Sequence, residues 1–417
     1  MNPEIEWPSW PTLYSPSLRS KPPLLTLNTQ AGHKSIEPGA SFTMYVCGIT
    51  PYDATHLGHA ATYLAFDLIN RYQRAAESKV SFVENITDID EPLLERAARD
   101  DVDWQKLAAS QVDLFRSDMT ALHILPPDHY VPATGVMGLI DQAITQMEKN
   151  GFVYRVENDL YFDIESFIPQ LPISLDEALA IFSERGGDPA RPGKRHPLDP
   201  VLWWANKNDE PGWESSHGYG RPGWHIECSV IALRYLIGTD FLGANDQEFS
   251  IDLQGGGSDL IFPHHFMSGA QAQALLGRPF ARHYVHGGMV GLDGEKMSKS
   301  KGNLVFVSKL ISAGVDPMVI RFALLQDHYQ SDRMWSDDSL KSATDAVAVI
   351  RSALSREFVS PTEGLISEII TSLSQNLDTP AVLAKLRMWA ERVDDAPTQQ
   401  GAGELSRTLD ALLGLAL

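Results

Sequence analysis

The sequence predicts an α/β fold with a parallel sheet, and two stretches carry this prediction. Residues 42–46 (FTMYV) are β-formers typical of a buried strand, and a turn-rich segment joins them to a helical pattern over residues 60–72. Residues 80–85 (VSFVEN) form a second strand pattern. A strand, a tight turn and a helix bring backbone N–H groups and a positive helix end against a phosphate. We therefore expect a ligand beyond the carboxyl ends of the strands.

Length and composition limit the class of protein. The 417 residues suffice for two or three domains, and 34 Lys and Arg against 54 Asp and Glu give a net charge of −20. Such a surface repels polyanions, so a nucleic-acid partner would need a local basic patch, and no run of Lys and Arg supplies one. Two distant cysteines exclude a disulfide framework. Without a leader or a long apolar run, we expect a soluble cytoplasmic protein with no membrane partner.

The rest of the chain is divided by its turn signals. Residues 1–40, rich in Pro and Ser, are expected to form a strand-poor lead-in. A polar, irregular insertion around 184–194 separates the two halves of the α/β domain. The remaining expected elements are helices over 104–122 and 134–149, a hairpin over 152–164, a helix over 230–236, strands over 249–253 and 283–290, and C-terminal helices over 318–326, 340–357, 365–376, 380–393 and 402–415.

Two segments are candidates for phosphate binding. His56 and His59 stand three apart at the predicted helix start, so both can face the same phosphates, and Gly58 between them leaves room for a nucleotide. The alternative is two surface histidines at a helix cap. The loop 296–303 (KMSKSKGN) packs three lysines and two serines into its first six residues, and such a loop can close over a triphosphate. Its alternative is a solvated basic loop.

Polar residues after strands supply further ligand candidates. Asn85 and Thr87 are candidates for hydrogen bonds to a ligand, whereas Asp88 and Asp90 serve equally well as turn or helix-cap residues. Three glycines, 255–257, follow the predicted strand 249–253 and would let the backbone approach a ligand closely.

Cys47, Cys228 and the pair His264-His265 form a candidate metal set. Two thiolates and one imidazole suit Zn²⁺, and three protein ligands leave the fourth position open, as in a catalytic site. Structural zinc sites more often use closely spaced Cys pairs, which are absent here. The alternative for each cysteine is a small buried hydrophobe.

Five motifs, in this order, resemble one known family: CGITPYDATHLGHAATY, NITDID, GWHIECS, GGGSDLIFPHH and KMSKS. Over roughly residues 40–350 the chain is similar to the cysteinyl-tRNA synthetases and their shorter relatives, the cysteine ligases of mycothiol biosynthesis. The resemblance implies a class I synthetase-type Rossmann (HUP-like) domain with an inserted connective region and a C-terminal helical bundle. The implied boundaries are a lead-in over 1–40, catalytic halves over 41–140 and 216–305, a connective insertion over 141–215 and a helical domain over 306–417.

The resemblance also implies the site. It places one zinc per chain on Cys47, Cys228 and His264, and catalytic charges on His56, His59, Lys296 and Lys299. Cysteinyl-adenylate would contact Cys47, Gly48, Ile49, Thr50, Thr62, Asn85, Ile86, Thr87, Trp224, Gly257, Ser258, Asp259 and Val290. The chain departs from the synthetases at 264–268 (HHFMS), where they usually show HHENE, and Phe266 is unusual for the ligases as well. A longer stretch than usual, about 237–250, precedes the glycines.

The activity implied is adenylation of L-cysteine by ATP with Mg²⁺, followed by transfer to an amine. Asp259 is a candidate general base, and ribose binding is an equal alternative for it. Three functions compete: a ligase acting on 1D-myo-inositol 2-amino-2-deoxy-α-D-glucopyranoside (GlcN-Ins), a cysteinyl-tRNA synthetase, and a catalytically dead zinc-binding or tRNA-mimicking protein. The intact motifs disfavour the third.

Several features favour the ligase without a tRNA partner, as an expected monomer. The chain is acidic, and its final helices, 365–417, are short and not basic. Gln254 stands where the synthetases typically carry His and the ligases Gln. Acidic residues at 88–90, 184 and 188 would suit a cationic amino sugar.

Overall fold

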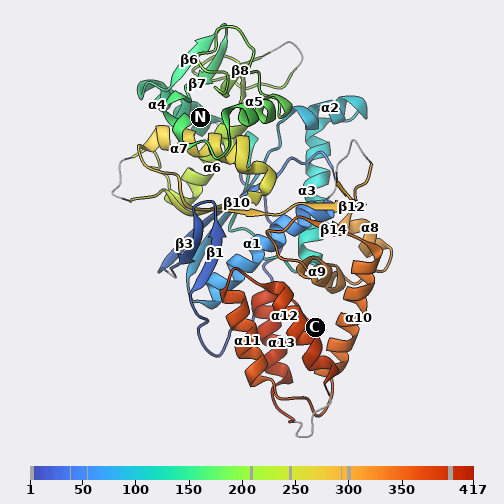
Figure 1. The fold of residues 1–417 in the computed structure, drawn as a ribbon. Helices are drawn as coiled ribbons and strands as arrows, with labels where there is room; N and C mark the ends of the chain where they lie inside the picture. Colours follow the sequence, from blue (N-terminus) through green and yellow to red (C-terminus); the bar gives the residue numbers. More distant parts are fainter. Residues whose placement is uncertain are drawn as a thin grey trace.

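The computed structural model describes residues 4–37, 39–53, 55–206, 210–243, 247–292, 294–297, 302–392 and 398–417, with Lys296 described by its backbone only. A parallel five-stranded sheet lies at the centre of the chain (Figure 1). Its order is β11 (Ala281–Gly287), β10 (Ile251–Gly257), β3 (Ser41–Ile49), β4 (Lys79–Ile86) and β5 (His129–Pro132). The strand order reverses between β3 and β10, and in open α/β sheets ligands bind at such a switch point.

Strand β3 connects two hydrophobic cores because its side chains alternate between the faces of the sheet. Met44 and Val46 enter a core that includes α1 (Leu57–Ala75) and the C-terminal helices. Tyr45 and Cys47 enter the opposite core, with α6 (Trp224–Ile237) and α7 (Phe266–Leu276). Both faces of β3 are buried, which explains why its sequence reads as a nearly continuous apolar run.

An antiparallel sheet of β6 (Val153–Val156), β7 (Asp159–Phe162), β8 (Val201–Ala205) and β9 (Gly220–Pro222) lies between the two halves of the parallel sheet in sequence. It stands above the central sheet in Figure 1, beside α4 (Met137–Lys149) and α5 (Leu175–Glu184). The remaining short elements are η1 (Ala133–Val136), η2 (Glu165–Gln170), η3 (Ser258–Leu260), η4 (Ile261–His265), and a small sheet of β12 (Val290–Leu292), β13 (Glu295–Lys296) and β14 (Arg333–Trp335).

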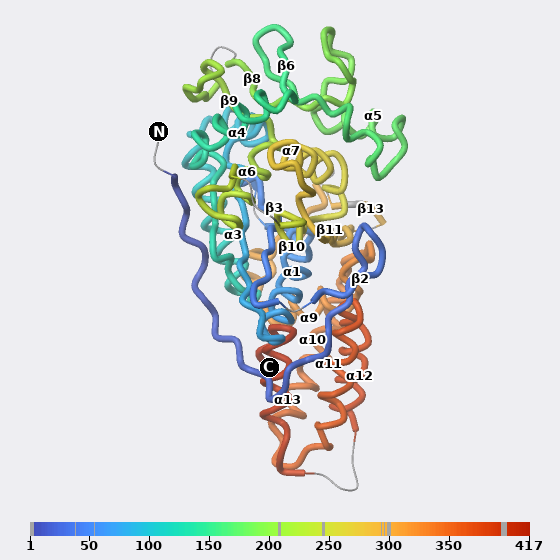
Figure 2. Tube along the Cα trace, turned by 90° about the vertical axis from the view of Figure 1, so that its left-hand side faces the viewer, coloured from blue at the N-terminus to red at the C-terminus, as the bar shows by residue number. Residues whose placement is uncertain are grey.

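Most of the remaining chain is helical. Between β4 and β5 lie α2 (Glu91–Arg99) and α3 (Trp104–Ala121), and after the small sheet come α8 (Val307–Ser312) and α9 (Pro317–Leu325). The helices α10 (Asp337–Leu354), α11 (Glu363–Ser374), α12 (Thr379–Glu391) and α13 (Ala402–Leu413) gather at the end opposite the antiparallel sheet (Figures 1 and 2). No helix in the described part of the chain is long and apolar enough to cross a membrane.

Three expectations about local structure were wrong. The lead-in contains an antiparallel hairpin, β1 (Leu25–Thr29) and β2 (Gly32–Ile36), in which Leu25 and Leu27 are buried. Strand β10 includes the three glycines, so they are not a loop after the strand. Helix α6 begins at Trp224, ahead of the expected 230, and Cys228 therefore lies within this buried helix. In each case tertiary packing overrides a weak local signal.

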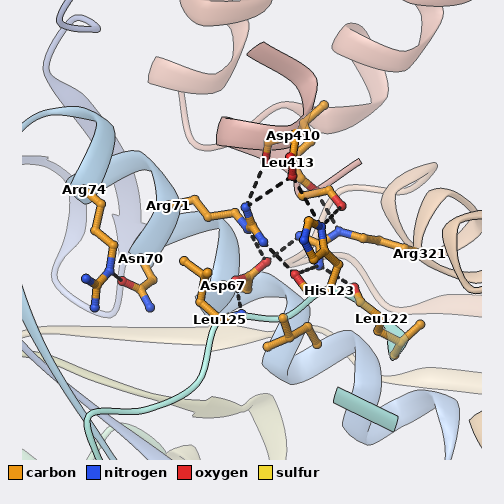
Figure 3. Close-up of polar contacts among 12 residues, drawn as sticks. Asp67, Asn70, Arg71, Arg74, Leu122, His123, Leu125, Arg321, Asp410 and Leu413 are labelled. Atoms are coloured by element: carbon orange, nitrogen blue, oxygen red, sulfur yellow. Dashed lines mark hydrogen bonds and ion pairs between the residues drawn. The ribbon is translucent and has the colours of Figure 1, made fainter. Parts of the chain in front are cut away.

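A buried ionic cluster joins helix α1, which packs on the parallel sheet, to the C-terminal helices (Figure 3). Asp67 on α1 contacts Arg71 at 2.8 Å and Arg321 on α9, and all three side chains are fully buried. Arg321 also donates to the carbonyls of Leu413 at 2.6 Å and Leu122 at 2.7 Å. Burial alone would raise the pKa of Asp67, but the two guanidinium groups outweigh it and lower that pKa. The cluster thus ties α1, α9 and the end of α13 together.

Candidate active site

A cavity of about 370 Å³ opens at the carboxyl ends of β3 and β10, at the switch point of the sheet. We call it the first cavity. Most of the predicted contact residues line it, and they come from segments far apart in sequence. The predicted residues in its wall are Cys47, Gly48, Ile49, Thr50, His56, His59, Thr62, Trp224, Gly257, Asp259 and Val290. Tyr52, Asp53, Gly58, Tyr63, Arg185, Leu260, Met289, Met297 and Leu304 complete it.

The two histidines of HLGH lie together at the start of α1. Their rings stack with centroids 3.8 Å apart, and His56 is the N-cap residue, accepting a hydrogen bond from Gly58 N at 3.1 Å. A Cβ on Gly58 would lie 2.8 Å from the His56 ring, so glycine is needed for this packing. Both rings and the positive helix end therefore face the cavity, an arrangement suited to an anion.

Cys47, Cys228 and His264 form a buried Cys–Cys–His cluster at the edge of the first cavity. Their ligand atoms all lie within 4.8 Å of one another, and His264 Nε2 is 3.2 Å from Cys228 Sγ. The other nitrogen of His264, Nδ1, is 3.0 Å from Nδ1 of His225, which fixes the ring from behind. Trp224 stacks on His264 with centroids 4.1 Å apart. Of the three, Cys47 also lines the cavity, so the cluster opens into it.

The two thiols of the cluster have different electrostatic environments. Burial and the neighbouring Cys228 raise the pKa of Cys47. Burial also opposes ionisation of Cys228, but hydrogen bonds from Cys47 and His264 outweigh it and lower the Cys228 pKa. The surroundings therefore favour the thiolate of Cys228 over that of Cys47, and a bound dication would favour both thiolates.

Residues outside the predicted set support Cys47. Gln254 donates to Cys47 Sγ at 3.4 Å, and His265 Nε2 lies 3.3 Å from the same sulfur. His265 Nδ1 is in turn 2.8 Å from His286 Nε2. Burial lowers the pKa of His265 and brings that of His286 to about 4, so both rings are neutral near pH 7. Gln254 and the His pair stand out in the sequence, whereas no sequence pattern marks His286.

Some predicted contact residues lie behind the cavity wall and not in it. Asn85, Ile86 and Thr87 are almost fully buried, and Asn85 Oδ1 accepts hydrogen bonds from Tyr45 at 2.9 Å and from Gly48 N at 2.8 Å. A Cβ on Gly48 would lie 1.7 Å from the Asn85 carbonyl oxygen, so the two segments are in close contact. Asn85 thus holds the backbone that follows Cys47. Ser258 likewise does not line the first cavity, although its neighbours do.

Two of the three glycines of β10, Gly255 and Gly256, have a packing role, which corrects the expectation that they approach a ligand. A Cβ on Gly255 would lie 2.3 Å from the Phe66 ring, and one on Gly256 would lie 2.9 Å from the His265 ring. Only Gly257 lines the first cavity. The run therefore lets α1 and the His pair lie close to the strand.

The lysine-rich loop is only partly described. Lys299 and the residues beside it, 298 and 300–301, lie outside the described residues, as does the side chain of Lys296. Met297 is buried and lines the first cavity, so the chain that carries Lys296 passes along its rim.

Comparison with known proteins identifies the class. Residues 34–345 match the family model described as tRNA synthetases class I (C) catalytic domain. In fold, the chain resembles Mycobacterium tuberculosis methionyl-tRNA synthetase in complex with methionyl-adenylate, with a TM-score of 0.61, 17% identity and coverage of 90% of this chain and 88% of that one. It also resembles a leucyl-tRNA synthetase of Agrobacterium radiobacter, with a TM-score of 0.59, 10% identity and coverage of 91% and 84%.

Closer relatives identify the branch. Proteins named L-cysteine:1D-myo-inositol 2-amino-2-deoxy-alpha-D-glucopyranoside ligase are 49% identical in Streptomyces griseus, over 98% of this chain and 100% of the relative, and 50% identical in Salinispora tropica, over 96% and 98%. The relative of that name in Thermomonospora curvata is 47% identical over 98% and 100%. The chain therefore belongs to the class I synthetase family, on the branch of these cysteine ligases.

Proposed function

We propose that the protein activates L-cysteine with ATP and transfers the cysteinyl group to the amine of GlcN-Ins, forming an amide. One observation carries the proposal: the Cys–Cys–His cluster opens into the same cavity as the stacked histidines of HLGH. A site for a thiol thus adjoins a site for phosphates. The names of relatives about half identical over nearly the full chain support the choice of acceptor.

Zinc fits the Cys–Cys–His cluster. Tetrahedral zinc with bonds of 2.0–2.3 Å places its donor atoms about 3.3–3.8 Å apart. His264 Nε2 and Cys228 Sγ are 3.2 Å apart here, and all three donor atoms lie within 4.8 Å of one another. Two sulfurs and one imidazole also match its preferred donors, and His225 supplies the outer contact that a zinc-bound histidine usually has. Bound there, zinc would supply a soft Lewis acid that prefers the thiolate of cysteine to the hydroxyl of serine.

In the first step, an oxygen of the cysteine carboxylate forms a bond to the α-phosphorus of ATP, and the bond to pyrophosphate breaks. His56 and His59 would bind the phosphates and stabilise their charge at the start of α1, together with Mg²⁺ carried by ATP. We assign Lys296 and Lys299 to the same task. Trp224, packed on His264, would orient the cysteine beside the cluster.

In the second step, the nitrogen of the acceptor amine attacks the carbonyl carbon of cysteinyl-adenylate. The new C–N bond replaces the C–O bond to AMP, which leaves with the electron pair, and the amine releases its proton. Asp259 lines the first cavity, where it can bind the ribose or accept this proton.

The test measures two reactions of the purified protein. We expect ATP–pyrophosphate exchange that depends on cysteine, and AMP formation when GlcN-Ins is added. Purified tRNA specific for cysteine, tested as the alternative acceptor, should not be aminoacylated at a comparable rate. Comparable cysteinylation of tRNA would favour a synthetase, and absence of exchange would indicate a protein without this activity.

A further inference from the structure

A second cavity, of about 510 Å³, adjoins the first. Residues Thr50, Tyr52, Arg185 and Trp224 line both cavities, so the two share one wall. The second cavity is lined by the start of α2, the segment 185–188 after α5, and β8. Its volume lies within the range of small-molecule sites. A ligand bound here would lie next to whatever occupies the first cavity.

The second cavity is acidic. Four carboxylates line it, those of Asp90, Glu91, Glu95 and Asp188, against the two guanidinium groups of Arg185 and Arg221. Two of these carboxylates are paired, Glu91 with Arg221 at 3.1 Å and Asp188 with Lys194 at 2.9 Å, and Arg221 also lies 3.5 Å from Glu210. The remaining charges of this lining are the carboxylates of Asp90 and Glu95 against the guanidinium of Arg185. Such a lining favours a cation and repels a phosphate backbone.

The walls of the second cavity also carry fixed aromatic and polar groups. Trp204 packs edge-on against Tyr161, with centroids 6.4 Å apart, and lies under the guanidinium of Arg191. Asp188 is held by Tyr161 and by Lys194 at 2.9 Å. An indole ring and carboxylates held in place can bind the apolar face and the hydroxyl groups of a sugar-like ring with little loss of side-chain entropy.

We propose that the second cavity is the binding site for the acceptor, and that it takes a cationic, polyhydroxylated amine. The amine would lie at the shared wall beside Thr50 and Trp224, and the rings would extend past Trp204 toward Glu95 and Asp188. This inference rests on the proposed function, because an acceptor must reach the activated carbonyl from a neighbouring site. It assigns recognition of the acceptor to α2 and to the segment 185–188, and it assigns binding of cysteine and ATP to the first cavity.

Glu95→Gln and Trp204→Leu test the assignment. Glu95 is exposed, so its substitution is compatible with folding, and Glu148→Gln, an exposed change on α4 outside both cavities, is the matched control. Cysteine-dependent ATP–pyrophosphate exchange, which needs no acceptor, should be unchanged in all three variants. The KM for GlcN-Ins should rise about fivefold or more in Glu95→Gln, as expected for the loss of one charge-assisted hydrogen bond, and should stay unchanged in the control.

A second measurement separates binding of the rings from binding of the amine. The analogue of GlcN-Ins with a hydroxyl in place of the amine is measured as a competitive inhibitor. Because Glu95 faces the rings in this assignment, Glu95→Gln should weaken binding of the analogue about as much as it raises the KM for GlcN-Ins. If wild-type protein ligates GlcN-Ins but both cavity variants keep the wild-type KM, the acceptor assignment is overturned and the proposed function stands. If wild-type protein forms no AMP with GlcN-Ins, the proposed function itself fails.

Discussion

Replacing Arg321 by methionine should destabilise the whole chain. Arg321 is fully buried and donates to Asp67 and to the carbonyls of Leu122 and Leu413, all in the cluster of Figure 3. Methionine fills a similar volume but offers no donor. Removing one partner of a buried ion pair costs about 3–5 kcal/mol. Because Arg71 still binds Asp67 at 2.8 Å, we expect the lower end, about 3 kcal/mol.

The assay is urea unfolding at neutral pH, followed by circular dichroism. Arg74→Met on α1 is the control, because the Arg74 side chain is half-exposed and its ion pair with Asp128 is 3.7 Å long. The variant loses mainly one hydrogen bond, from Arg74 to Asn70 at 2.7 Å, so we expect a loss of about 1 kcal/mol (Figure 3). In a double-mutant cycle, Asp67→Asn should cost less in the Arg321→Met background than in the wild type. Equal losses for the Arg321 and Arg74 variants would refute the reasoning.

Three further predictions concern the site. Cys228→Ala should abolish stoichiometric zinc, as measured by metal analysis of the purified protein, and full zinc content in this variant would contradict the assigned cluster. Lys299→Ala should slow ATP–pyrophosphate exchange by about 10²–10³ while leaving cysteine binding nearly intact, and an unchanged rate would show that the loop is not catalytic. Burial lowers the pKa of His286 to about 4, below its usual 6.5, so the unfolded chain takes up a proton first as the pH falls. The free energy of unfolding should therefore drop by about 2 kcal/mol between about pH 7 and pH 5, and His286→Gln should lose less over the same range.

The central strands and most helices followed from sequence because their signals are local. A buried parallel strand such as β3 needs a continuous apolar run, and the C-terminal helices repeat apolar residues with helical periodicity. The hairpin of β1 and β2 carries a weak signal because one of its strands is mostly exposed. The glycines of β10 resemble a ligand loop in sequence, but the neighbours that require them, Phe66 and His265, are evident only in three dimensions.

The residues of the candidate site also differ in how well the sequence alone could predict their roles. Motif residues such as His56, His59 and Cys47 could be singled out from the sequence, and they line one cavity. The role of Asn85 could not be read from its position after a strand, since its amide contacts Gly48 and Tyr45 behind the wall. The second cavity was only suggested by acidic residues: Asp90 and Asp188 line it, whereas Asp88 is buried against Thr134. Which carboxylates come together around the second cavity depends on how the inserted segment 184–194 is placed relative to α2.

The pairing of β3 with β10 has a consequence for synthesis of the chain. Met44 lies opposite Leu253, so the ribosome must make the whole antiparallel insertion before the middle strand of the parallel sheet gains its second neighbour. Until then β3 presents an apolar edge with unpaired backbone groups, a state prone to association with other chains. Nascent chains that end within the insertion are therefore expected to depend on chaperones. The same delay means that Cys47 is translated long before Cys228 and His264, so a metal can join the three only after most of the catalytic half has been made.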